Sequence, residues 1–294
     1  MTVVVHTRKD YWALMEGAPD NEARGDRACV PTMGALHAGH MQLVTAAREL
    51  VGPRGQVVVT IFVNPTQFGA SEDLASYPRP FHEDVAQCVT AGVDIVFAPT
   101  VEEMYPGGAR LDTMTSVHPG PVGEILEAVD RPGHFAGMLT VVAKLLGITQ
   151  PQHAFFGEKD YQQLALITSM VADLNMPVTV HGVPTVRDAD GVALSSRNTY
   201  LSESERVIAQ SIPAALRAAQ RTEGTVADKV QVAQAHLSAE IDVHYLEAMS
   251  NDLSARLDPA LAPLSGRLLF AGNVGSTRLI DNMDIGAGGM GDTA

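Results

Sequence analysis

Two histidines stand where a phosphate group could bind. His37 and His40 flank Gly39 in the stretch Pro31–His40, which follows an apolar run and precedes a helical pattern. Backbone N–H groups and the dipole at a helix N-terminus attract anions. Imidazole N–H groups nearby can stabilise charge that develops on phosphorus under in-line attack. The alternatives are a pair of surface histidines and a zinc-binding pair. No carboxylate stands at metalloprotease spacing, and the context between a strand and a helix favours phosphate chemistry.

A second strand-to-helix turn carries a lysine. Phe156–Asp160 ends an apolar run and opens a helical pattern. Lys159 is a point charge that suits a phosphate, and Asp160 suits either a ribose hydroxyl or the helix cap. Later, Ser195–Arg197 places two hydroxyls and a guanidinium in series. That series suits a triphosphate, and a helix-capping serine turn is its alternative.

Neutral amides and a basic turn suggest a site for an acid. Gln67 and Gln163 can bind hydroxyl and carboxylate oxygens without adding charge. Arg131 can pair with a carboxylate and His134 can orient a neighbour, unless both belong to a helix-capping turn.

An acidic helix start is a weaker candidate. Glu83, Asp84 and Gln87 share one helix face and could hold Mg²⁺ through water. We favour a solvated helix start there and assign no metal ligand.

The elements that must position these residues alternate in type. Short apolar runs rich in β-branched residues predict strands buried on both faces. They cover residues 2–6, 27–31, 57–63, 94–98, 153–156 and 177–183. Helical patterns separate them at about 38–51, 81–92, 134–149 and 160–174. This alternation predicts an α/β, Rossmann-like, doubly wound parallel sheet.

The pattern changes near residue 185. Two helical stretches follow at 202–221 and 225–240, and then strand-like pieces at 241–248, 267–271 and 276–283. We expect a domain over 1–185, a smaller α+β domain over 186–285 and a disordered glycine-rich tail over 286–294.

Composition excludes several classes of protein. The 294 residues contain 20 Lys+Arg and 34 Asp+Glu, a formal net charge of −14, which disfavours nucleic-acid and anionic-membrane binding. Two cysteines, Cys29 and Cys88, provide no disulfide framework, and no signal peptide or membrane-spanning run is present. A cytoplasmic protein is expected.

Several motifs together resemble one family. The His-x-Gly-His turn resembles the nucleotidyltransferase superfamily. The rest of the chain is similar to the pantothenate synthetase (pantoate–β-alanine ligase) family through Ile61–Gly69, Arg131–Gly137, Phe156–Gln163, Leu194–Asn198 and Gly272–Asn282. These motifs run in order from about residue 30 to 283.

The resemblance implies an activity and a set of site residues. It implies ATP-dependent condensation of pantoate with β-alanine through pantoyl adenylate, with Mg²⁺, in a homodimer formed by the N-terminal domain. Catalysis would rest on His37, His40 and Lys159. The implied ATP-binding residues are Met33, Gly34, Ala35, Leu36, His37, Gly39, His40, Gly157, Glu158, Lys159, Asp160, Val186, Leu194, Ser195, Ser196 and Arg197. The implied pantoate and β-alanine residues are Met33, Phe62, Asn64, Gln67, Arg131, His134 and Gln163.

Two alternatives remain at this point. A related nucleotidyltransferase would move AMP onto an acceptor phosphate and form no amide. A non-catalytic nucleotide-binding protein could retain the fold without the reaction.

Overall fold

The chain divides into two compact units, and each is described by itself. The computed structural model describes residues 1–16, 25–69, 74–75 and 77–286. The N-terminal unit comprises Met1–Glu158 and Leu166–Pro184, and the C-terminal unit comprises Lys159–Ala165 and Thr185–Ala294. One boundary, between Ala165 and Leu166, therefore falls within helix α7 (Tyr161–Asp173). The short segment Lys159–Ala165 groups with residues that follow it by about twenty positions or more.

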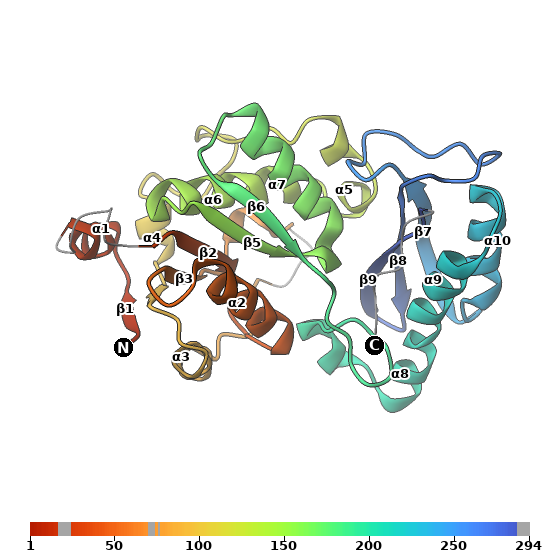
Figure 1. Cartoon of the computed structure of the whole chain (residues 1–294), viewed down its shortest axis with the longest axis horizontal. Coiled ribbons are helices and arrows are strands. Elements are labelled where there is room, and N and C mark those ends of the chain that lie inside the picture. Colours follow the sequence, from red (N-terminus) through yellow and green to blue (C-terminus); the bar gives the residue numbers. More distant parts are fainter. Residues whose placement is uncertain (17–24, 70–73, 76, 287–294) are drawn as a thin grey trace. The chain divides into compact units, whose positions relative to one another are not determined.

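Six parallel strands form the sheet of the N-terminal unit. They are β1 (Val3–Val5), β2 (Arg27–Thr32), β3 (Gln56–Ile61), β4 (Ile95–Phe97), β5 (His153–Gly157) and β6 (Thr179–Val183), in the order β1-β4-β3-β2-β5-β6 (Figure 1). Every pairing among them is parallel. Residues 57–59 of β3 are fully buried, as a strand covered on both faces requires. The predicted Rossmann-like class is confirmed.

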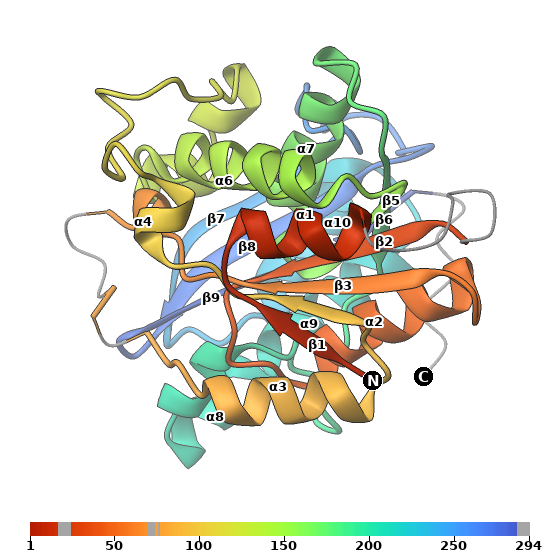
Figure 2. The ribbon, with the colours of Figure 1, turned by 90° about the vertical axis from the view of Figure 1, so that its left-hand side faces the viewer.

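Helices cover both faces of this sheet. On one face lie α1 (Arg8–Glu16) and α6 (His134–Thr149), and on the other α2 (Ala38–Val51) and α3 (Phe81–Thr90) (Figure 2). Shorter helical pieces are η2 (Pro65–Gln67), α4 (Val101–Met104), η3 (Pro121–Glu124), α5 (Glu127–Asp130) and η4 (Glu158–Asp160). Thr32 pairs with Ile61 at the ends of β2 and β3. The loops after both strands therefore leave the same carboxyl edge of the sheet, where open α/β sheets bind ligands.

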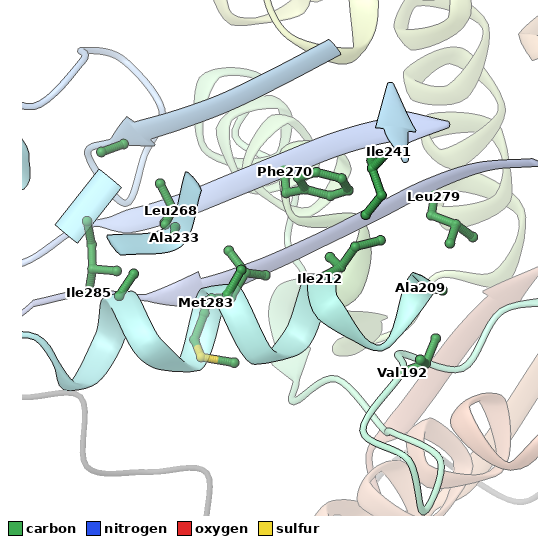
Figure 3. Packing of buried hydrophobic residues seen from close by; sticks show 14 of the residues in the cluster. Val192, Ala209, Ile212, Ala233, Ile241, Leu268, Phe270, Leu279, Met283 and Ile285 are labelled. Carbon is green, nitrogen blue, oxygen red and sulfur yellow. The ribbon is translucent and has the colours of Figure 1, made fainter. Parts of the chain in front are cut away.

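The C-terminal unit is an antiparallel sheet packed on helices. Its strands β7 (Ile241–Met249), β8 (Arg267–Val274) and β9 (Thr277–Asp284) follow the order β7-β8-β9. Its helical pieces are η5 (Ser196–Tyr200), α8 (Glu203–Ala209), α9 (Ser211–Arg221) and α10 (Val226–His236). Apolar side chains of α9, β8 and β9 form one core, with Ile212, Phe270 and Met283 among them (Figure 3).

The expected single helix over 202–221 is wrong. The structure ends α8 at Ala209 and begins α9 at Ser211. Pro213 explains the break, because a proline cannot donate to the carbonyl four residues earlier and its ring collides with that carbonyl. The expected disordered tail lies, apart from Gly286, outside the described residues. In the described part of the chain, no helix combines the length and apolarity that a membrane crossing requires.

Candidate active site

The turn between β2 and α2 holds both histidines in a defined tautomer. His37 caps α2, and its Nδ1 accepts the Gly39 N–H at 3.1 Å. The Nδ1 of His40 accepts the His37 N–H at 3.3 Å, and the two ring centroids lie 4.1 Å apart. A ring nitrogen that accepts a hydrogen bond carries no proton. The neutral form of each imidazole therefore carries its N–H at Nε2.

Gly39 is required between the two histidines for a steric reason. A Cβ at this position would lie 2.9 Å from Cε1 and 3.0 Å from Nδ1 of His37. The 2.9 Å contact is closer than real Cβ atoms approach, so a side chain here would displace the ring. The glycine in the motif thus maintains the place of His37.

A buried carboxylate from α3 holds the loop before the histidines. Asp84 is 1% exposed, and its oxygens accept the N–H groups of Ala35 at 2.9 Å and Leu36 at 2.7 Å. A Cβ on Gly34, whose φ is +84°, would lie 2.9 Å from the same carboxylate. Asp84 therefore fixes the backbone that precedes His37, a role that sequence reasoning missed.

The acidic helix start does not fit a metal site. Both Asp84 oxygens accept backbone N–H groups, Gln87 Nε2 donates to the Leu36 carbonyl at 3.1 Å, and Glu83 is exposed. Among the described residues, no group of three or more His, Cys, Asp and Glu side chains is arranged to hold a metal.

Two buried amides lie after β3 on the same carboxyl edge. Asn64 donates from Nδ2 to Gln67 Oε1 at 3.0 Å and accepts the Tyr105 hydroxyl at 2.7 Å. Gln67 Nε2 lies 3.2 Å from the Met33 sulfur. Burial raises the pKa of Tyr105, so this phenol remains a donor at neutral pH. The amides are thus fixed in orientation by their neighbours.

His134 links a guanidinium to the same turn. Its Nδ1 lies 2.8 Å from the Gln67 carbonyl oxygen, to which it must donate. Its Nε2 then accepts from Arg131 Nη1 at 3.1 Å. Arg131 and His134 therefore hold the backbone of Gln67 in position. The start of α6 also packs closely here, because a Cβ on Gly137 would lie 2.1 Å from the Thr66 carbonyl oxygen.

An apolar cavity of about 320 Å³ opens beside this turn within the N-terminal unit. Met33 and Phe62, two of the residues that the resemblance implies for the substrates, both line it. Phe62 is itself buried, with its ring 6.1 Å from that of Tyr105.

Gly157 is the last residue of β5, and Glu158 is the first residue of η4. The expected residues that follow them lie in the C-terminal unit. Lys159 Nζ lies 3.9 Å from Asp160 Oδ1, and Gln163 follows on α7. The Leu194 N–H donates to the Val186 carbonyl at 2.9 Å, which closes a hairpin-like turn. Ser195 caps η5 through the Arg197 N–H at 3.2 Å. The expected residues are thus divided between the two units.

Comparisons with known proteins agree with these motifs. A sequence model of the family described as Pantoate-beta-alanine ligase matches residues 4–284. A pantothenate synthetase from Corynebacterium jeikeium is 56% identical over 264 residues, covering 89% of this chain and 83% of that protein. The chain belongs to the pantoate-beta-alanine ligase family.

Solved structures of the same family share the fold. The ligase from Thermus thermophilus has a TM-score of 0.87 at 43% identity, covering 97% of this chain and all of that one. The ligase from Francisella tularensis, complexed with beta-gamma ATP and beta-alanine, has a TM-score of 0.76 at 32% identity, covering 96% and 97%. The family and the ligase activity expected from the sequence are confirmed.

Neither cysteine of this ligase is suited to covalent catalysis. Burial raises the pKa of Cys29 to about 12 and that of Cys88 to about 11. Both thiols are therefore protonated at neutral pH and lack the thiolate that a nucleophile needs.

Proposed function

We propose that the chain joins pantoate to β-alanine in two half-reactions. In the first, a pantoate carboxylate oxygen attacks the α-phosphorus of Mg-ATP, which forms pantoyl adenylate and releases pyrophosphate. In the second, the free amine of β-alanine attacks the acyl carbonyl, AMP departs and the amine loses a proton. The Francisella tularensis ligase, complexed with beta-gamma ATP and beta-alanine, supports the choice of two of the substrates.

The observation that carries this proposal is the geometry of the histidine turn. Both Nδ1 atoms accept backbone N–H groups, so both imidazoles carry their N–H at Nε2. They sit at the first turn of a 14-residue helix, where the dipole favours an anion. We assign His37 and His40 to the stabilisation of charge on the phosphoryl oxygens, together with Lys159. His40 is also a candidate proton donor to a leaving oxygen.

The buried amides form the proposed cradle for pantoate. Asn64 and Gln67 add no charge, so the substrate carboxylate retains its nucleophilicity. Arg131 and His134 position this turn, and Gln163 supplies a further amide. Met33 and Phe62 provide apolar surface for the substrate's geminal methyl groups, which is supported by their place on the cavity wall.

The family resemblance assigns the proposed ATP-binding residues one by one. The turn Met33–His40 would receive the phosphates, Asp160 the ribose, and Val186 the adenine or ribose. Lys159 and Ser195–Arg197 would bind the triphosphate. Gly157, Glu158 and Leu194 complete this assignment.

Three further assignments rest on family resemblance. Mg²⁺ is proposed to enter as part of the Mg-ATP substrate, and Asp84 is not proposed as its ligand, since both of its oxygens accept backbone N–H groups. The assembly is a homodimer formed through residues 1–185, and light scattering that gives a monomer would exclude it. The cytoplasm is the proposed location, which is supported by two buried thiols without a disulfide.

One assay tests the reaction. Labelled pyrophosphate should exchange into ATP only when pantoate is present, and AMP should appear when β-alanine is added. Exchange without pantoate would indicate an AMP transfer to another acceptor. Binding of ATP without any exchange would indicate a nucleotide-binding protein that lacks the reaction.

A further inference from the structure

The segment that carries Lys159 is held by the last strand of the chain. Asn282 on β9 donates from Nδ2 to the Lys159 carbonyl oxygen at 2.9 Å. Tyr161, two residues on, donates to the Asn251 carbonyl at 2.9 Å, and the Arg267 guanidinium lies 3.9 Å from the centre of its ring. These contacts explain why residues 159–165 group with the C-terminal unit.

The amide of Asn282 is fixed in one orientation. Arg267 donates from Nη1 to Asn282 Oδ1 at 2.5 Å, so the oxygen faces the guanidinium and the Nδ2 group faces Lys159. Asn282 is 4% exposed, and a buried amide in this position loses a partner if it rotates. Arg267 thus supports the lysine segment twice, through Tyr161 and through Asn282.

The neighbouring residue holds the second group of expected phosphate ligands. Asp281 is 4% exposed, and its carboxylate accepts hydrogen bonds from both terminal nitrogens of Arg187, at 2.7 and 3.0 Å. Arg187 also donates to the Gly191 carbonyl at 3.3 Å. It therefore anchors the turn of residues 187–193 that leads directly into Ser195–Arg197.

We propose that Asp281 and Asn282 are positioning residues that hold Lys159 and the Ser195–Arg197 turn as one phosphate-binding module. Successive strand residues point to opposite faces, so one dipeptide can hold two separate segments. Both segments are then carried by the C-terminal unit. This inference rests on the triphosphate role proposed above for Lys159 and Ser195–Arg197.

The test replaces the amide donor and retains its shape. Asn282→Asp preserves an oxygen for Arg267 and removes the donor to Lys159. Pantoate-dependent pyrophosphate exchange should fall about 10–100-fold, because small displacements of a catalytic group have effects of this size. Attack of β-alanine on added pantoyl adenylate should change little. Asn273→Asp, which alters a more exposed β8 amide bonded to His244, is the control and should retain wild-type exchange.

A double-mutant cycle separates positioning from general damage. If Asn282 acts through Lys159, Asn282→Asp should add almost no further loss in a Lys159→Ala background. Additive losses, or equal losses in both half-reactions with a lower Tm, would overturn the inference. Asn282→Ser, a second variant, preserves the test if the aspartate variant does not fold. Wild-type protein without pantoate-dependent exchange would defeat the proposed function itself, whereas normal exchange in Asn282→Asp defeats only this inference.

Discussion

Two histidine pairs in the N-terminal unit differ in the hydrogen bonds of their ring nitrogens, and these bonds determine what each pair can do. His37 and His40 bond through Nδ1 to backbone N–H groups. His153 and His181 bond to each other, Nδ1 to Nε2 at 3.0 Å, and His153 Nε2 lies 3.3 Å from Asp26. The first pair presents Nε2 donors at a helix N-terminus. The ring nitrogens of the second pair bond to each other and to the side chain of Asp26, so we expect this pair to serve stability alone.

The largest expected effect tests the first pair. His40→Ala should lower pantoate-dependent pyrophosphate exchange by about 10²–10³-fold, as the loss of one donor to a developing oxyanion does. ATP binding should change little, because backbone N–H groups remain. Single-turnover adenylation and nucleotide binding, measured together, check this. A variant that forms adenylate at the wild-type rate would remove His40 from the reaction.

Asp84→Asn tests whether Asp84 positions the loop that carries His37 and His40. The new NH₂ group would face a backbone N–H of the loop, so the loop should shift and exchange should fall about 10–100-fold. Glu83→Gln, at the exposed neighbouring position, should behave as wild type. Excess Mg²⁺ should not restore exchange in Asp84→Asn. Restoration would mean that Asp84 binds the metal.

Gly39→Ala should separate activity from stability. The added methyl group would meet the His37 ring at 2.9 Å, and a displaced ring should lower exchange about tenfold. Tm should change little, because the gain of about 1 kcal/mol from alanine in a helix offsets the weakened His37 cap. Gly147→Ala on α6, where a Cβ would meet nothing within 4 Å, is the matched control and should leave exchange unchanged. Normal exchange in Gly39→Ala would show that the His37 ring tolerates displacement.

Sequence patterns predicted the sheet better than the helix ends. Residues 57–59 lie in an unbroken β-branched run, and buried parallel strands require such a run. The expected helix over 202–221 failed at Gln210, because apolar periodicity continues through a break that Pro213 imposes.

The motifs located most of the candidate site but not its supports. His37 and His40 are separated by two residues, so their shared helix start is visible in the sequence. Asp84 acts on a loop 48 residues earlier, and Asn282 acts on Lys159 across 123 residues. Partners so distant along the chain are set by strand order and packing, which no local spacing encodes.

The smallest expected effect concerns the second histidine pair. Burial, and then the charge of His153, lower the pKa of His181 from 6.5, so the fold favours its neutral form. The unfolded chain then binds more protons below pH 6.5, and stability should fall as the pH drops through that value until the folded pKa is passed. Asp26 is the one carboxylate bonded to the pair among the described contacts, and Phe155 stacks on His181 at 4.7 Å.

A substitution at this pair checks the sign of that pH dependence. His181→Gln should reduce the loss of Tm between about pH 7.5 and 5.5 by about 2 °C. Exchange activity should stay at the wild-type level, and His82→Gln, at an exposed histidine, should leave the pH profile of Tm unchanged. If His181→Gln instead abolished exchange, the division between a catalytic and a structural pair would be wrong.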